Sequence, residues 1–225
     1  MSRRRLAAMA PLLLAAFFFL AAAAAQPGSP QPGRLHAQKI AEGVWFIPGD
    51  ASKGYCNNIV IEMRDYLIVV DANYPGRARE LVSEISQLSP KPVRFVFDTH
   101  AHRDHAYGNI VWTEAGATTF AYQGVADEMD RYESKRWRDT AAEREDVRSL
   151  NLTDAPRPQL LFRVSPFILK DATREVRFYF FGGRTRAAMA LSGSLTSVSC
   201  VPATPPSTVR TTSSGTRTSR TGRAF

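Results

Sequence analysis

The order of apolar and polar positions predicts a sheet first and helices later. Short apolar runs separated by polar turns are typical of strands, and they lie at 39–48, 58–63 and 66–70. From 76 to 88 the period changes, because Leu81, Ile85 and Leu88 fall on one face of a helix that two prolines end. The run 92–97 returns to strand character. This order predicts a mixed α/β (α+β) fold in which helices cover a sheet.

The second part of the pattern predicts a long charged helix and closing strands. A strand at 118–122 precedes a helical region at 123–150 that is dense in alternating charges, which we interpret as a solvated face. Met129, Tyr132 and Trp137 are assigned to core packing, with a substrate lid as the alternative. The charged residues of this region include Glu128, Glu133 and Arg136. Closing strands are predicted at 160–169 and 175–181.

The chain opens with the pattern of an export signal. Arg3, Arg4 and Arg5 precede an apolar run from 6 to 25 that ends in three alanines before Gln26, as in a secretory signal peptide over residues 1–25. A retained membrane anchor is the alternative, because the run just reaches spanning length. We therefore expect a periplasmic or secreted protein without stable membrane association after cleavage.

One domain is expected to follow. Residues 26–34 are rich in Pro and Gly and are predicted to form a linker. The stretch 35–182 then provides about 150 residues, enough for one hydrophobic core and not for two.

The net charge of +8 resides at the two ends of the chain. Of the 29 Lys and Arg residues, three lie among the first five residues and six after residue 183. The remaining basic residues nearly balance the 21 acidic ones. The charge therefore gives no support to nucleic-acid binding by the domain, and a small-molecule substrate is expected. The oligomeric state does not follow from the sequence.

The candidate chemistry lies directly after the strand at 92–97. Three of the four histidines fall here, as His100, His102 and His105, with Asp104 between the last two. In an extended backbone alternate side chains point the same way, so His100 and His102 share a face, and a turn brings Asp104 and His105 back toward it. Imidazole nitrogen and carboxylate oxygen suit zinc, and can also hold iron or manganese. The spacing H-x-H-x-D-H predicts a metal site far more specifically than a lone histidine.

This motif resembles that of the metallo-β-lactamase superfamily, metallohydrolases that include glyoxalase II, lactonases, arylsulfatase-like enzymes and the zinc β-lactamases. The resemblance implies an αββα sandwich, of which this sequence supplies the first half. It also implies that His100 and His102 bind a first metal and that Asp104 and His105 bind a second. In an intact relative, the two metals share a hydroxide that attacks an ester, thioester, lactone, amide or sulfate centre, and Asp104 helps to orient it. The presence of His105 is closer to the general hydrolases, so a β-lactam hydrolase is the alternative.

Three neighbouring residues extend the resemblance. Superfamily members commonly carry an aspartate where Asp71 ends the strand at 66–70, and there it orients the metal loop. A plain turn-forming aspartate is the alternative. After the motif, Gly108 would let the backbone approach the metal loop closely, and Asn109 could hydrogen-bond to it.

The composition changes at Gly183. From there to Phe225 there is no Asp, Glu, Lys or His, and 17 of 43 residues are Ser or Thr, so we expect this tail to be disordered. Cys200 lies in the tail, and we do not expect it to form a disulfide with Cys56. The tail stands where a superfamily member would supply a third histidine, a bridging aspartate and a final histidine. Besides the motif only His36 remains, so this chain cannot assemble that full site.

A shifted reading frame would account for the tail. Joining the last base of each codon to the first two of the next permits A-H-T-R-G-D-G from residues 183–190, which resembles the superfamily's third-histidine motif. The same shift permits L-C-T-G-D-A from 199–205, which resembles the bridging-aspartate motif and places its aspartate 19 positions beyond the recovered histidine. Two motifs in order and in register are hard to obtain by chance. We therefore predict an out-of-frame tail and an impaired hydrolase, with an inactive metal-binding remnant as the alternative.

Overall fold

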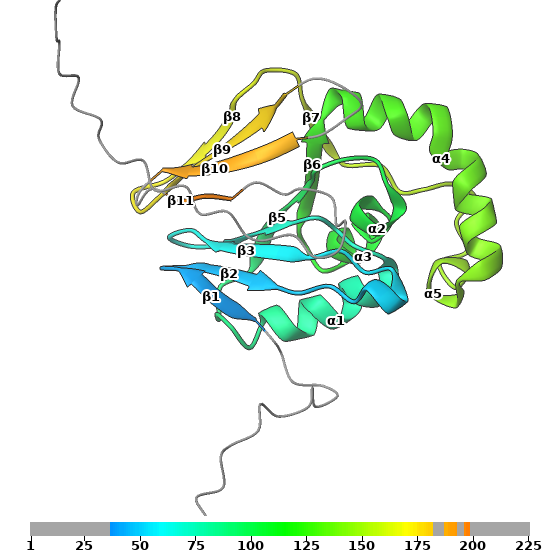
Figure 1. Cartoon of the computed structure of the whole chain (residues 1–225), viewed down its shortest axis with the longest axis horizontal. Coiled ribbons are helices and arrows are strands. Elements are labelled where there is room, and N and C mark those ends of the chain that lie inside the picture. Colours follow the sequence, from blue (N-terminus) through cyan, green and yellow to red (C-terminus); the bar gives the residue numbers. More distant parts are fainter. Residues whose placement is uncertain (1–36, 182–186, 193–195, 199–225) are drawn as a thin grey trace, which may run out of the picture. The chain divides into compact units, whose positions relative to one another are not determined.

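A computed structural model of the chain describes residues 37–181 and the backbone of two strands at 187–192 and 196–198 (Figure 1). The chain divides into a unit that ends at Arg34 and a unit that begins at Leu35, and the described residues belong to the second. The predicted signal peptide and linker lie outside the described residues. Within the described part, no helix is both long and apolar enough to cross a membrane.

A seven-stranded sheet carries the metal motif, and its strand order follows the sequence from β1 to β7. Its strands are β1 Gln38–Ala41, β2 Val44–Ile47, β3 Asn58–Glu62, β4 Leu67–Val70, β5 Val93–Asp98, β6 Thr118–Tyr122 and β7 Leu160–Phe162. The pairs from β1 to β4 are antiparallel, and those from β4 to β7 are parallel. Strand β4 is buried at every position, as expected where both faces of a sheet are covered.

A second sheet packs on one face of the first (Figure 1). It is an antiparallel meander of β8 Phe167–Lys170, β9 Glu175–Phe180, β10 Ala187–Ser192 and β11 Thr196–Val198. The ring of Phe178 on β9 lies 4.6 Å from that of Phe97 and 5.0 Å from that of Phe120, centroid to centroid. The two sheets therefore share one apolar core.

Helices cover the other face of the first sheet. The helices are α1 Pro75–Ile85, α2 Arg103–Ala106, α3 Asn109–Glu114, α4 Gln123–Glu143 and α5 Glu145–Arg148, with a short 3₁₀ turn at Ala51–Lys53. Leu81 of α1 and Trp112 of α3 pack against Val69 and Val96, which point away from the second sheet. Helices α4 and α5 enclose a third cluster with Tyr107. The mixed α/β class is confirmed, and the described layers are helices, sheet and sheet.

Three predicted elements are divided in the structure. The strand predicted at 39–48 is two strands, because Gly43 adopts a φ of +63° and turns the chain. The helix predicted at 123–150 ends at Arg144, whose φ and ψ of −118° and 122° are extended. The strand predicted at 160–169 is divided between the two sheets, with Pro166, which has no N–H for a ladder, in the connection.

The charged helix differs from its prediction at two positions. Met129 and Trp137 are buried, which confirms core packing, whereas Tyr132 is half exposed. Glu133 was assigned to the solvated face but is only 1% exposed. The Glu133 carboxylate points inward, where it accepts hydrogen bonds from Tyr107 and Arg136.

Residues 183–225 were predicted to be largely without regular structure, and within this region the structure describes two strands, β10 and β11. Both are paired strands, and β10 extends the sheet by pairing with β9. Backbone pairing uses N–H and C=O groups that every residue except proline supplies, so an unusual composition does not prevent it. Residues 199–225 lie outside the described part.

Candidate metal centre

The metal motif lies where the parallel strands end. Strand β5 ends at Asp98, His100 follows in the loop, and His102 stands at the N-cap of α2 with an extended backbone. Asp104 and His105 lie on α2, whose first turn is closed by the bond from the His105 N–H to the His102 carbonyl, 2.9 Å. A short helix thus provides the predicted turn.

The structure brings the predicted ligands together. The ring of His100 lies 4.6 Å from that of His102 and 3.9 Å from that of His105, centroid to centroid. His105 Nε2 lies 3.3 Å from Asp104 Oδ2. Nitrogen and oxygen ligands at about 2.0–2.2 Å from a tetrahedral zinc ion would be separated by a similar distance. Asp104 and His105 are therefore spaced as two ligands of one metal ion would be.

The electrostatic environment prepares two of these side chains for ligation. Burial, together with the charge of the nearby His105, lowers the pKa of His100 to about 3, so its ring is neutral at pH 7. Burial alone would raise the pKa of Asp104, but its contact with His105 lowers it below the ordinary value. A neutral imidazole and an ionised carboxylate are the forms that bind metals.

Asp71 contacts both ends of the motif from the end of β4. It is 2% exposed, and its Oδ1 accepts bonds from the N–H and hydroxyl of Thr99, 2.9 and 2.7 Å. The Thr99 hydroxyl also lies 2.9 Å from His100 Nδ1. Asp71 Oδ2 is 2.8 Å from His105 Nδ1, an ion-pair distance, although the two groups are not aligned as a hydrogen bond. This arrangement matches the predicted orienting role, which remains a prediction.

The charge on His105 follows from this contact. Burial by itself would lower the pKa of His105, but the negative charge of Asp71 raises it well above the ordinary value. With Asp71 facing Nδ1, the Nε2 atom faces Asp104. A metal ion bound there would replace the proton on Nε2.

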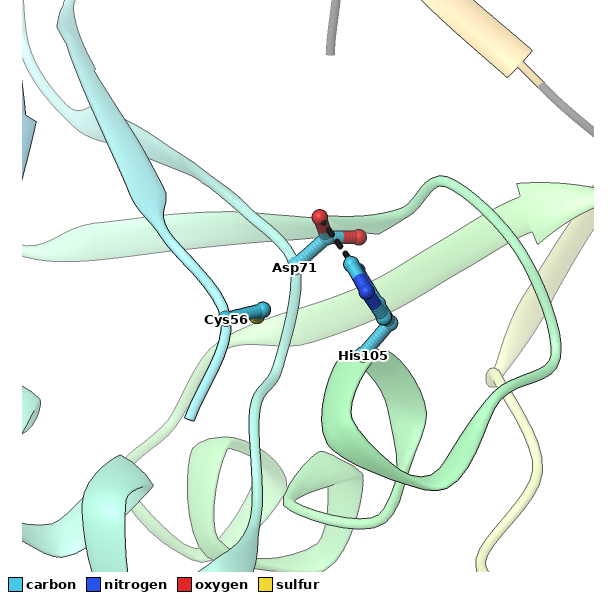
Figure 2. Close-up of side chains that lie close together, drawn as sticks. All are labelled: Cys56, Asp71 and His105. Atoms are coloured by element: carbon cyan, nitrogen blue, oxygen red, sulfur yellow. Dashed lines mark ion pairs between the residues drawn. The ribbon is translucent and has the colours of Figure 1, made fainter. Parts of the chain in front are cut away.

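Cys56 forms a second group of donor atoms with Asp71 and His105, as Figure 2 shows. Their ligand atoms all lie within 4.8 Å of one another, and among the described residues no other set of three or more does so. No three of the four motif residues have their ligand atoms within that distance of one another. Burial raises the pKa of the Cys56 thiol to about 11, so a metal would have to displace its proton.

The sequence interpretation missed Cys56 as a site residue, since it was considered only as a disulfide partner. Cys56 precedes β3, Asp71 follows β4, and these strands pair with Ile59 opposite Val70. The two predicted strands, paired as a hairpin, would have brought the thiol and the carboxylate to the same edge. That pairing was the available signal.

Gly108 and Asn109 hold the segment after the motif against the ends of β4 and β5, so the close approach of Gly108 is to the loop after β4 and not to the metal loop as predicted. The Gly108 N–H donates to the carbonyl of Asn73, 2.7 Å, and a Cβ on Gly108 would lie 2.3 Å from the carbonyl oxygen of Ala72. Only glycine fits this approach. The Asn109 amide donates to Asp98 Oδ2, 2.7 Å, and so ties α3 to the end of β5.

A cavity of about 360 Å³ opens beside the motif. Its lining residues are His102, Arg103, Asp104, Glu133 and Arg136. Two predicted ligands thus face a space that can hold a small molecule. The residues from α4 in this lining were not predicted, because their inward position depends on contacts with distant segments.

Comparison with protein families assigns the chain. The family model for the metallo-beta-lactamase superfamily matches residues 51–198. The chain belongs to this superfamily. Superfamily members usually bind metal ions, in agreement with the donor groups described above. No curated protein matches the chain.

Solved structures of several metallo-beta-lactamases have a similar fold. One from Pontibacter korlensis is 17% identical with a TM-score of 0.53, over 70% of this chain and 67% of that chain. A HARLDQ-motif mutant from Cronobacter sakazakii is 17% identical with a TM-score of 0.56, over 76% of this chain and 66% of that chain. This superfamily member thus spans about two thirds of the length of these structures.

Proposed function

We propose that this superfamily member is a zinc-dependent hydrolase of a small molecule with an ester, thioester, lactone or amide bond, impaired in the chain as written. The supporting observation is the meeting of His100, His102, Asp104 and His105 at the end of β5, with His105 Nε2 3.3 Å from Asp104 Oδ2. The adjoining cavity gives a substrate access to His102 and Asp104.

The motif residues and Asp71 have different proposed roles. His100 and His102 would hold one zinc ion, and Asp104 and His105 a second; iron or manganese suits the same donors. Bound zinc would supply Lewis-acid polarisation of the substrate and a water of lowered pKa. Asp71 keeps the Nε2 face of His105 directed at Asp104. Asp104 carries a negative charge at the cavity wall, where it can orient a nucleophile by accepting its proton in a hydrogen bond.

An inactive metal-binding remnant is the second candidate. The motif supplies only two histidines to the first ion, whereas a catalytic zinc usually has three protein ligands. The sequence has four histidines in all, and the fourth, His36, stands before the domain strands. The compact group of Cys56, Asp71 and His105 offers three donors for an ion without catalysis.

Zinc content and hydrolysis, measured together, test these candidates. We expect the purified chain to bind zinc weakly and to hydrolyse at least one of a panel of esters, thioesters, lactones and β-lactams at a rate only slightly above background. His102→Ala should remove that activity and lower the zinc content. Zinc binding with equal background rates in both proteins would favour the remnant. Failure to bind any metal would refute both candidates.

We further propose export to the periplasm or the medium. The support is the basic cluster at Arg3 to Arg5, the apolar run and the three alanines before Gln26. Mass spectrometry of the exported product should find an N-terminus at or near Gln26. A membrane-bound product that retains residues 6–20 would contradict the proposal.

A further inference from the structure

Two arginines line the cavity beside the metal motif. Arg103 lies on α2, between the predicted ligands His102 and Asp104, and Arg136 lies on α4. Both arginines are exposed, so their guanidinium groups are accessible to a ligand in the cavity of about 360 Å³. Two elements far apart in the sequence thus bring two positive charges to one space.

A buried carboxylate holds Arg136 in place. Glu133 is 1% exposed, and its Oε1 accepts a bond from Arg136 Nη1, 2.7 Å. Its Oε2 accepts a bond from the Tyr107 hydroxyl, 2.6 Å, and Tyr107 directly follows α2. The guanidinium of Arg136 also lies 5.3 Å from the ring centroid of Tyr132. Glu133 therefore links the metal loop to α4 and restricts Arg136 to the cavity wall.

Arg103 is positioned by a weaker contact. Its Nη1 donates to the Thr140 hydroxyl on α4, 3.4 Å. Because this partner is neutral, the contact leaves the charge of Arg103 available to a ligand. A guanidinium presents several N–H donors in a plane, which suits a carboxylate.

The charges around the cavity favour an anion. Arg103 and Arg136 balance Asp104 and Glu133 when the motif holds no cation. Each divalent cation bound by the motif adds two positive charges beside the cavity, which then attracts negatively charged ligands. Glu133 offsets the charge of Arg136, but its bond is to Nη1, so the other N–H groups of this exposed guanidinium can still donate to a ligand. The net positive charge comes from Arg103 and the bound cations.

We propose that Arg103 and Arg136 form a subsite for a carboxylate group carried by the substrate. Only the identification of the ligand as a substrate rests on the proposed function. Binding of a carboxylate at these two arginines can be measured without turnover. The scissile bond would lie toward His102 and Asp104, and the carboxylate toward α4.

Binding of phthalate, compared with its neutral analogue phthalamide, tests the subsite. Calorimetric titrations of the full chain are made with zinc and after removal of metal, which separates binding by arginine from binding by zinc. We expect phthalate to bind at least about tenfold more tightly than phthalamide, and Arg136→Gln and Arg103→Gln each to weaken phthalate binding about tenfold. Arg136→Lys should lose part of the affinity, because an ammonium lacks the planar fork.

Arg138→Gln is the matched control, because Arg138 is an exposed arginine on the same helix outside the cavity lining. It should bind phthalate like the unchanged chain. Arg136→Gln removes a partner of a buried acid, so its fold is checked by circular dichroism; Arg103→Gln removes no such partner and keeps the test valid if Arg136→Gln unfolds.

The outcomes distinguish a failure of the subsite proposal from a failure of the proposed hydrolase function. Equal binding of phthalate and phthalamide, or equal effects of Arg103→Gln and Arg138→Gln, would overturn the subsite even if hydrolysis is found. Arginine-dependent phthalate binding without hydrolysis of any ester, thioester or lactone would support the subsite and count against the proposed function.

Discussion

Asp71 joins the two ends of the metal motif through one carboxylate. Its Oδ1 accepts two bonds from Thr99, while its Oδ2 lies 2.8 Å from His105 Nδ1. Its φ of 68° shows that it also has the turn conformation considered as the alternative role. The turn and the contacts are therefore compatible, since the left-handed backbone directs the side chain at the loop.

Replacing Asp71 should weaken metal binding. Without this carboxylate, His105 loses the contact that directs Nε2 toward Asp104, so we expect Asp71→Ala to lower zinc affinity about 10–100-fold. Competition with a chromophoric chelator measures the affinity. Asp65→Ala, at an exposed aspartate, is the control. Unchanged affinity in Asp71→Ala would contradict the orienting role.

Asp171 should make stability depend on pH. Slight desolvation would raise its pKa, but bonds from the N–H of Arg64 and from Thr173 and Arg174 lower it well below the ordinary value. Because the folded pKa is lowered, its stabilisation is present above about pH 4 and is lost as the pH falls through the folded pKa. Asp171→Asn should cost about 1–2 kcal/mol at pH 7 and less at pH 3, by urea unfolding. Equal costs at both pH values would contradict this.

The sequence predicts single site residues only where the signal is local. His100, His102, Asp104 and His105 could be predicted as ligands because their spacing belongs to one short stretch. Glu133 could not, since its burial depends on Tyr107, 26 residues away.

At the scale of elements, the predictions succeed where a segment carries its own periodicity. Strand β6 was predicted at 118–122 and is found there, and α1 begins one residue before its predicted start and ends three residues before its predicted end. The errors lie where one residue changes the backbone direction, as at Gly43, Arg144 and Pro166. A hydrophobic pattern does not record such changes, because it describes side chains and not φ and ψ.

Gly108 leaves no room for a side chain next to the motif. A Cβ there would lie 2.3 Å from the Ala72 carbonyl oxygen and 2.9 Å from the Ala78 Cβ on α1. Gly108→Ala must therefore push α1 and the metal loop apart, and we expect it to lower the free energy of unfolding by about 1–3 kcal/mol. Urea unfolding measures this change.

Gly124→Ala is the control for Gly108→Ala. Gly124 lies in α4, and its nearest neighbours would be ring atoms of Tyr122 at 3.3 and 3.4 Å. Alanine favours a helix over glycine by about 1 kcal/mol, which offsets the close contact. A loss of stability in Gly124→Ala as large as in Gly108→Ala would show that close packing at the motif is not the cause.

At the scale of the whole molecule, the two sheets and their helices follow from pattern and superfamily, but the region after residue 183 does not. Strands β10 and β11 extend the second sheet, although this region contains no Asp, Glu, Lys or His. Strand β10 pairs along the whole of β9, from Phe180 to Glu175. Regular structure in this region therefore depends on an available strand edge and not on composition. The two strands do not test the predicted shift of the reading frame.

Zinc stoichiometry should distinguish the chain as written from one with the frame restored after Gly182. In the chain as written, His100 and His102 supply two ligands to the first ion, one fewer than the usual minimum for catalytic zinc. We expect weak binding of about one zinc ion per chain at most, and hydrolysis close to background. The restored frame would add a histidine and an aspartate, so two ions and clear hydrolysis should return and be lost again in His102→Ala. Metal analysis after dialysis gives the stoichiometry. Two tightly bound ions and efficient turnover in the unrepaired chain would show that the region after residue 183 supplies ligands in its present frame.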